Sequence, residues 1–280
     1  MIEVEEEGSA TARASAGAGP PPSPVVAALA TTAVKGLRLH ARSEIVLERT
    51  GVAGNRLFYL IDERGTLVNG KRIGALTAGG ADYEPGTEVL TMSFPDGAEA
   101  SGRVELGDAI ETRFFSRSPT VRLVAGPWSE ALSHYAGRRL RLVRADPDLG
   151  GGVDRGLGGT VSLISRESVT RLEEIAGGRT VDSRRFRMLI EIAGVDAHEE
   201  DEWIGREVRI GDALVAMRGN VGRCRVTTMD PDTGMVDLPT LDLLSSYRGE
   251  LDSSEPLAFG IYGEVLEPGT VRVGDRARPA

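Results

Sequence analysis

The sequence predicts a mainly β (α+β) protein built from two β-barrel-like modules with a few short helices. Three observations support this prediction. Short apolar or alternating segments recur along the chain and are separated by Gly, Pro, Asp and Asn, which is typical of strands joined by tight turns. Helical periodicity is nearly absent before residue 127. A strand running into Gly-Asp occurs at 104–108, 208–212 and 271–275, and this dipeptide tolerates the backbone angles of tight turns between strands.

Residues 1–24 combine acidic residues with Ala, Ser, Gly and Pro. They have too few large apolar side chains to offset the entropy lost on ordering, so we expect a disordered tail. The first module is expected over residues 25–126. Alternation and flanking turn residues predict its strands at 25–29, 44–47, 57–61, 89–94 and 110–114.

The second module is expected over residues 127–280. It begins with a predicted helix at 128–135, which Pro127 opens. A second helix is predicted at 166–175, with Ser165 as its N-cap. Strands are predicted at 140–143, 186–192, 207–210, 214–218, 223–229 and 271–273.

Composition restricts the classes of function. The 280 residues include 33 Lys+Arg and 42 Asp+Glu, for a formal net charge of −9. A nucleic-acid-binding protein usually carries the opposite sign, because neutralisation of phosphates drives that binding. No segment approaches the ~18 consecutive apolar residues that a membrane-spanning helix needs. We therefore expect no nucleic acid partner and no membrane association.

Cys224 is the only cysteine, which excludes an intramolecular disulfide and favours a cytoplasmic location. The three histidines are scattered, so any metal is expected to come inside a prosthetic group. Arg223 and Arg225 flank the thiol, and cationic neighbours stabilise the thiolate that attacks electrophiles or binds soft metals. A structural cysteine buried on a strand is the alternative that the spacing leaves open. Residues 230–234, Asp-Pro-Asp-Thr-Gly, predict a tight turn directly afterwards.

Several segments around this cysteine resemble the MOSC domain, the carboxy-terminal domain of molybdenum cofactor sulfurases. They are Arg223-Cys224, the run 227–234, Phe-Gly-Ile-Tyr at 259–262 and Pro-Gly-Thr-Val-Arg-Val-Gly-Asp at 268–275. Residues 33–36 and 51–62 are similar to the amino-terminal β-barrel module of the same family. The family includes two-module proteins such as the amidoxime-reducing components.

The resemblance implies that the molybdenum cofactor, a Mo-pyranopterin, lies between the two modules with Cys224 as the molybdenum ligand. Such an anionic group needs cationic partners, and a planar guanidinium binds phosphate with two hydrogen bonds. The positions that match the family and are expected to bind the cofactor are Lys35, Arg56, Ser165, Arg187, Arg223 and Cys224, with Thr160 and Ser162 near the pterin. The chain departs from the family pattern at Ala33, Asn55 and Leu189, where the family commonly has Pro, Asp and Asn.

The function that the resemblance implies is an oxidoreductase that reduces small N-oxygenated substrates such as hydroxylamines, amidoximes or N-oxides. Candidate proton sources are Asp230 and Asp232 beside the catalytic Cys224, the acidic run 199–202 and His198, and no spacing singles one out. A separate electron-donor protein is expected, because one cysteine cannot hold an iron–sulfur cluster and no dinucleotide-binding fingerprint occurs. Two alternatives stay open: a sulfur carrier or sulfurtransferase that uses a Cys224 persulfide, and a cofactor-binding protein without turnover.

Overall fold

The computed structural model describes residues 23–145, 156–253 and 255–280. Strands dominate this part of the chain and are accompanied by three α-helices and several short 3-10 turns, which confirms the mainly β (α+β) class. The predicted tail, residues 1–24, lies outside the described residues except for its last two positions. Among the helices of the described ranges, none has the length and apolar character needed to cross a lipid bilayer.

Two large sheets contain most of the strands. The eight-stranded sheet has the order β19 (Ala277–Pro279), β15 (Glu207–Ile210), β16 (Ala213–Asn220), β17 (Ile261–Glu267), β13 (Val161–Ser165), β14 (Ile190–Ala193), β1 (Val25–Thr31), β2 (His40–Arg42). The five-stranded sheet has the order β10 (Glu105–Glu111), β11 (Thr120–Ala125), β12 (Arg141–Ala145), β5 (Phe58–Ile61), β6 (Leu67–Val68).

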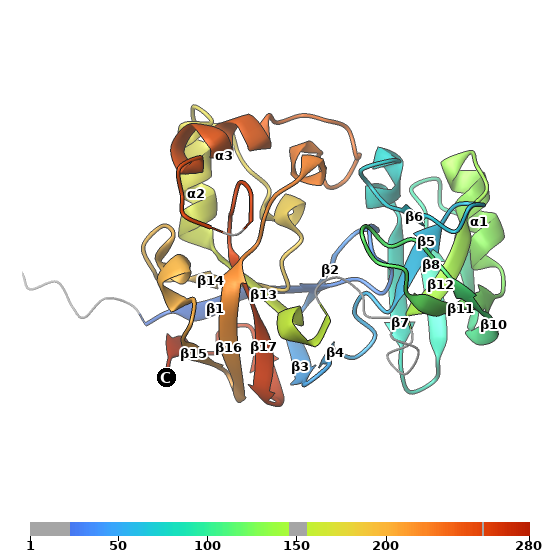
Figure 1. The fold of residues 1–280 in the computed structure, drawn as a ribbon, viewed down its shortest axis with the longest axis horizontal. Helices are drawn as coiled ribbons and strands as arrows, with labels where there is room; N and C mark the ends of the chain where they lie inside the picture. The colour runs from blue at the N-terminus through green and yellow to red at the C-terminus, as the bar shows by residue number, and fades with distance from the viewer. Residues whose placement is uncertain (1–22, 146–155, 254) are drawn as a thin grey trace, which may run out of the picture.

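Two three-stranded sheets and the helices complete the fold. The sheets have the orders β18 (Gly269–Arg272), β3 (Glu44–Glu48), β4 (Gly51–Val52) and β7 (Gly80–Glu84), β8 (Val89–Ser93), β9 (Glu99–Arg103). The helices are α1 (Trp128–Ala136), α2 (Arg166–Ile175) and α3 (Thr240–Arg248). Figure 1 shows two halves side by side. We call them the eight-stranded half, which includes β3, β4, β18, α2 and α3, and the five-stranded half, which includes β7, β8, β9 and α1.

The sheets do not divide the chain at the predicted boundary near residue 126. The amino-terminal strand β1 pairs with β14, and β3 pairs with β18, so residues 25–48 contribute strands to the eight-stranded half. Conversely, β12 comes after the predicted boundary but pairs with β5 in the five-stranded half. Strand pairing joins segments that are distant in sequence, and a change in composition along the chain does not reveal it. The described sheets are open, with edge strands at both ends of each order, so the two halves are not closed barrels.

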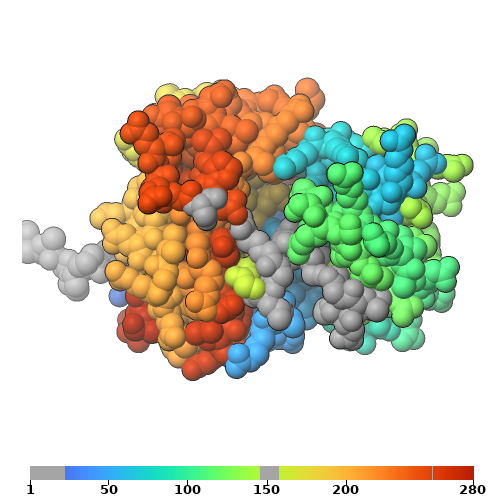
Figure 2. All heavy atoms as spheres, in the orientation of Figure 1, coloured from blue at the N-terminus to red at the C-terminus, as the bar shows by residue number. Residues whose placement is uncertain are grey.

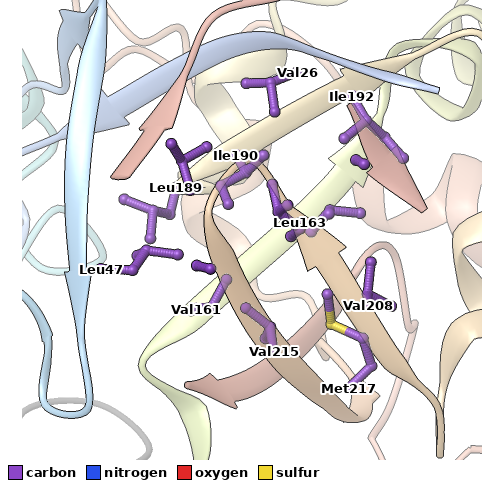
Figure 3. Packing of buried hydrophobic residues seen from close by; sticks show 14 of the residues in the cluster. Val26, Leu47, Val161, Leu163, Leu189, Ile190, Ile192, Val208, Val215 and Met217 are labelled. Atoms are coloured by element: carbon purple, nitrogen blue, oxygen red, sulfur yellow. The ribbon is translucent and has the colours of Figure 1, made fainter. Parts of the chain in front are cut away.

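Each half has its own apolar core. Figure 3 shows the core of the eight-stranded half, in which Val26, Leu47, Val161, Ile190 and Met217 meet from five strands. The core of the five-stranded half gathers around Trp128 of α1, whose indole N–H donates to the carbonyl oxygen of Leu90 over 3.1 Å. The buried indole therefore has its polar atom satisfied as well as its apolar surface covered.

Both predicted helices are confirmed. α1 begins after Pro127 and ends at Gly137, which adopts the left-handed conformation with φ 63. α2 spans the predicted residues, and the Ser165 hydroxyl accepts from the backbone N–H of Ser168 over 3.1 Å. The helix α3 was not predicted from the sequence. It packs against α2 and the turn at residues 225–228, and the hydroxyl of Thr240 donates to the carbonyl of Thr227 over 2.7 Å.

Two predicted strands are wrong. One was expected at 186–192. Phe186 instead ends the 3-10 turn η4 (Ser183–Phe186), and β14 begins only at Ile190. Residues 223–229 contain the 3-10 turn η6 (Arg225–Thr228) instead of a strand. Hydroxyls of threonines in η6 bond back to carbonyls three residues earlier, and such local bonds compete with strand pairing.

Candidate functional site

Cys224 lies at the start of η6, in an extended conformation with φ −142 and ψ 172. Its carbonyl oxygen accepts from the backbone N–H of Thr227 over 2.9 Å and from the Thr227 hydroxyl over 3.0 Å. The side chain is half-buried and forms no disulfide. The thiol thus lies directly before a tight turn, whose backbone the two hydrogen bonds from Thr227 hold in place. The prediction that Cys224 lies on a strand is wrong.

The two arginines beside Cys224 have different environments. Arg223 is buried, and its guanidinium donates to the carbonyl of Phe259 over 2.7 Å and to that of Phe186 over 2.9 Å. It also lies over the Phe186 ring, 5.3 Å from the ring centroid. Arg225 is exposed. Through these contacts Arg223 connects the end of η4, at Phe186, to the segment before β17, at Phe259.

Three other cations, Lys35, Arg56 and Arg187, lie within electrostatic reach of one another, and Lys35 also lies within reach of the thiol. Burial lowers the pKa of Lys35 well below its usual value, and the charges of Arg56 and Arg187 lower it further, whereas the charge of Cys224 raises it. Burial also lowers the pKa of Arg56 to about 10, and burial together with Arg56 lowers the pKa of Arg187 to about 9. Both guanidinium groups keep their proton at neutral pH. We call Lys35, Arg56 and Arg187 the cation cluster.

The cation cluster connects parts of the chain that are far apart in sequence. Lys35 lies between β1 and β2, Arg56 between β4 and β5, and Arg187 between η4 and β14. A guanidinium nitrogen of Arg56 donates to the carbonyl of Arg187 over 2.6 Å, and Arg187 donates to the carbonyl of Leu37 over 2.6 Å. Figure 2 shows the surface hollowed between the two halves.

Both arginines of the cluster have an uncommon backbone conformation. Arg56 has φ 52 and Arg187 has φ 56, in the left-handed region. For residues other than glycine this region costs on the order of 1 kcal/mol each, and such strain is concentrated at functional sites. The two guanidinium groups are therefore held in position at a conformational cost that the surrounding contacts must offset.

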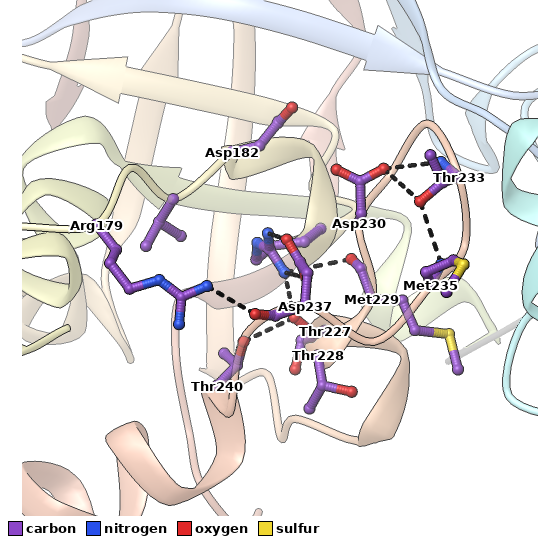
Figure 4. A network of polar contacts seen from close by, with 12 residues as sticks. Arg179, Asp182, Thr227, Thr228, Met229, Asp230, Thr233, Met235, Asp237 and Thr240 are labelled. Carbon is purple, nitrogen blue, oxygen red and sulfur yellow. Dashed lines mark hydrogen bonds and ion pairs between the residues drawn. The ribbon is translucent and has the colours of Figure 1, made fainter.

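Asp230 shapes the turn that follows η6 (Figure 4). Its carboxylate accepts from the backbone N–H groups of Asp232 and Thr233 over 3.1 and 2.7 Å, and from the Thr233 hydroxyl over 2.8 Å. The hydrogen bond from the Thr233 side chain is the main cause of its lowered pKa. These bonds hold Asp230 in the predicted turn and favour its charged form.

Arg185 ties this turn to η6. It is buried, and one guanidinium nitrogen donates to the carbonyls of Thr227 and Met229 over 3.0 and 3.2 Å. The same guanidinium pairs with the Asp237 carboxylate at 3.1 Å (Figure 4). The backbone that carries Cys224 is thus fixed by a side chain from η4, and the local sequence around the cysteine gives no sign of this.

Ser165 is buried in a separate network. Its hydroxyl contacts the Glu200 carboxylate over 2.8 Å and the Ser168 hydroxyl over 2.7 Å, in addition to capping α2. The Ser165 hydroxyl therefore has its hydrogen-bond partners within the protein. Of the two residues expected near the pterin, Ser162 accepts from the backbone N–H of Leu189 over 3.0 Å, whereas the Thr160 hydroxyl oxygen is buried without a hydrogen-bond partner. Leu189, the departure from the family pattern, is 4% exposed and belongs to the apolar core.

Phe115 was not identified from the sequence, because the strand prediction ended at its neighbour. The residue lies in the turn between β10 and β11 and is 53% exposed, with φ 53. The ammonium nitrogen of Lys35 lies 5.8 Å from its ring centroid, and that of Lys71 lies 5.5 Å away. An exposed aromatic ring therefore borders the cation cluster. The signal in the sequence was the adjacent pair of phenylalanines in a segment otherwise rich in charge and turn residues.

A metal ion held by protein side chains alone is not supported within the described part of the chain. No group of three or more His, Cys, Asp and Glu side chains is placed there so that it could hold an ion. Cys224 and the cation cluster are the groups that remain for a larger anionic ligand.

The model of the MOSC domain family matches residues 150–278. The human protein "Mitochondrial amidoxime reducing component 2" is 42% identical over 113 residues, which are 38% of this chain and 31% of that protein. The rat protein of the same name is 39% identical over 126 residues, 41% of this chain and 35% of that protein. The matches thus span about a third of the length of these relatives. Among solved structures, the YuaD protein of Bacillus subtilis aligns over 91% of this chain and 94% of its own, with 11% identity and a TM-score of 0.43.

Proposed function

We propose that this protein binds the molybdenum cofactor at Cys224 and the cation cluster, and that it reduces N-oxygenated small molecules. The proposal proceeds from the match of residues 150–278 to the MOSC domain family. The name of the relatives, amidoxime reducing component, points to the same substrate class. The reaction breaks a nitrogen–oxygen bond, consumes two electrons and two protons, and releases water. We expect the electrons to come from a separate donor protein.

The observation that supports this proposal is the concentration of positive charge beside the only thiol. The protein has a net charge of −9, yet Arg56 and Arg187 lie close enough to lower the pKa of Lys35, and Arg56 lowers that of Arg187. An anion bound among these three groups would offset their repulsion. An anionic phosphate and a pterin with hydrogen-bonding edges fit these donors, and the unpartnered hydroxyl of Thr160 offers a further one.

Cys224 fits the role of metal ligand for two reasons. One is that a thiolate binds soft metals. The other is that the cysteine is held in a fixed position. The bonds from Thr227 fix its backbone, and Arg223 and Arg185 fix the segments on either side. The cofactor, when bound, would supply a redox centre that accepts the oxygen of the substrate. The chain's own groups, Lys35, Arg56 and Arg187, would orient that cofactor.

The sulfur-carrier function through a Cys224 persulfide uses the same thiol but needs no permanent anion site. The bond from Arg56 to the backbone of Arg187 brings two cations together, which an anionic cofactor needs and a persulfide does not. This arrangement favours the cofactor-binding function.

Metal and pterin analysis of the freshly purified full chain tests this proposal. We expect molybdenum by mass spectrometry and oxidised pterin by fluorescence in equal amounts, together with reduction of an amidoxime by a chemically reduced dye. Cys224→Ser should lose most of the molybdenum or the activity while its melting temperature stays near that of the wild type. The exposed neighbour provides the control, since Arg225→Gln should retain both. A Cys224→Ser protein with normal molybdenum content and full activity would contradict the proposal.

A further inference from the structure

Phe114 and Phe115 form the tip of a tight turn, and the two rings have different environments. The backbone N–H groups of Phe114 and Arg117 each donate to the other's carbonyl, over 2.8 and 3.0 Å. Phe114 is fully buried and packs against the Tyr59 ring with 5.0 Å between the centroids. Phe115 is 53% exposed. The fold therefore anchors one ring in the core and presents the next to solvent.

The backbone of Phe115 is in the left-handed region, with φ 53. This conformation suits glycine or asparagine, and for a bulky aromatic residue it is an outlier. A turn that served only to connect β10 and β11 would be more stable with glycine at this position, which has neither the strain nor an exposed apolar surface. The phenylalanine is thus unfavourable for the backbone of the turn. Its ring packs edge-on against the Phe114 ring, with 5.1 Å between the centroids, and about half of it stays exposed for a further contact.

The position of the Phe115 ring indicates which contact its exposed surface can make. Lys35 and Lys71 are the only lysines of the chain, and both have their ammonium nitrogen within 6 Å of the Phe115 centroid, at 5.8 and 5.5 Å. Lys35 belongs to the cation cluster and senses the charge of Cys224. The ring is not needed to hold Lys35, because the buried Phe114 ring already lies 5.7 Å from the same nitrogen.

From this arrangement we propose that Phe115 is a specificity-determining residue, which contacts the organic group of the substrate and favours N-oxygenated compounds that carry a planar aromatic ring. This inference rests on the proposed reductase function. An exposed ring offers a face and an edge to a second aromatic group, and such pairs gain free energy beyond the burial of area. A small aliphatic substrate reaches the reacting centre without making this contact.

The test compares benzamidoxime with acetamidoxime, with a chemically reduced dye as electron donor. Phe115→Gly should lower kcat/KM for benzamidoxime by about threefold to tenfold and change that for acetamidoxime less than about twofold. Phe115→Tyr, which keeps the ring, should retain the wild-type preference. Val46→Ala, at a similarly exposed residue of β3, is the control and should change neither value. The melting temperature of Phe115→Gly should not fall, because glycine removes the strain.

A binding experiment without turnover provides an independent result. In Phe115→Trp, the additional indole fluorescence should change on titration with benzamidoxime and not with acetamidoxime. Equal losses for both substrates in Phe115→Gly, or no loss for either, would overturn the inference. A wild-type protein without molybdenum that reduces neither substrate would instead overturn the proposed function, and the fluorescence titration would then still decide whether the aromatic compound binds at Phe115.

Discussion

Burial and neighbouring charge both act on Lys35, in the cation cluster. Its ammonium group loses water on folding and is repelled by Arg56 and Arg187, and both effects lower its pKa. A bound anion has the opposite effect, because it stabilises the charged form. The protonation of Lys35 and the binding of an anion are therefore linked, and each favours the other.

This linkage predicts a pH dependence of cofactor retention. Below the lowered pKa, Lys35 is charged in the empty protein and the anion binds at full strength; as the pH rises through that pKa, the charge and part of the affinity are lost. We expect dialysis at increasing pH, followed by molybdenum analysis, to show this loss in the wild type. Lys35→Arg should flatten the profile, since a guanidinium keeps its proton. Identical profiles for the two proteins would show that Lys35 does not contact the anion.

At the scale of elements, the contact between the turn after η6 and the five-stranded half depends on two glycines. Gly234, with φ +71, lies so close to Gly74 of η1 (Gly74–Ala78) that a Cβ on either residue would overlap the other's carbonyl oxygen. Only glycine permits this approach of two backbones. The segment that begins at Cys224 is thereby held against the opposite half of the molecule.

Gly234→Ala should therefore lower the free energy of unfolding by about 1 to 3 kcal/mol and reduce molybdenum retention, because the turn must move away from η1. Gly137→Ala is the matched control. That glycine has a similar φ of +63, but nothing lies within 4 Å of the Cβ it would gain. Urea unfolding of both variants separates the backbone strain, which they share, from the overlap, which only Gly234→Ala has. Equal destabilisation in the two would show that the contact with Gly74 is unimportant.

Elements with a local signature were predictable from the sequence, and elements made by distant contacts were not. The helix α2 follows from its N-cap and its periodicity, so its predicted and observed ends agree. Residues 186–192 and 223–229 do not form the predicted strands over their full length. Their conformation depends on Arg185 and Arg223, which bond to carbonyls dozens of residues away. Both mistaken elements flank the candidate site.

At the scale of the whole molecule, the two halves exchange strands. Residues 25–48 pair with the carboxy-terminal strands, and β12 returns to the five-stranded sheet. The chain therefore passes between the halves several times, and Arg56, between β4 and β5, lies at one of these passages. The sequence suggested the cationic residues through a resemblance, but it could not show that three distant segments bring them together. Their meeting follows from the sheet topology.

X-ray absorption at the molybdenum edge of the purified full chain tests the central claim most directly, because it counts the sulfur atoms bound to the metal. The dithiolene of the cofactor supplies two, and the thiolate of Cys224 is expected to supply one more. A shell of three sulfur neighbours is the predicted result. A shell of only two would show that the single cysteine of this chain is not a molybdenum ligand.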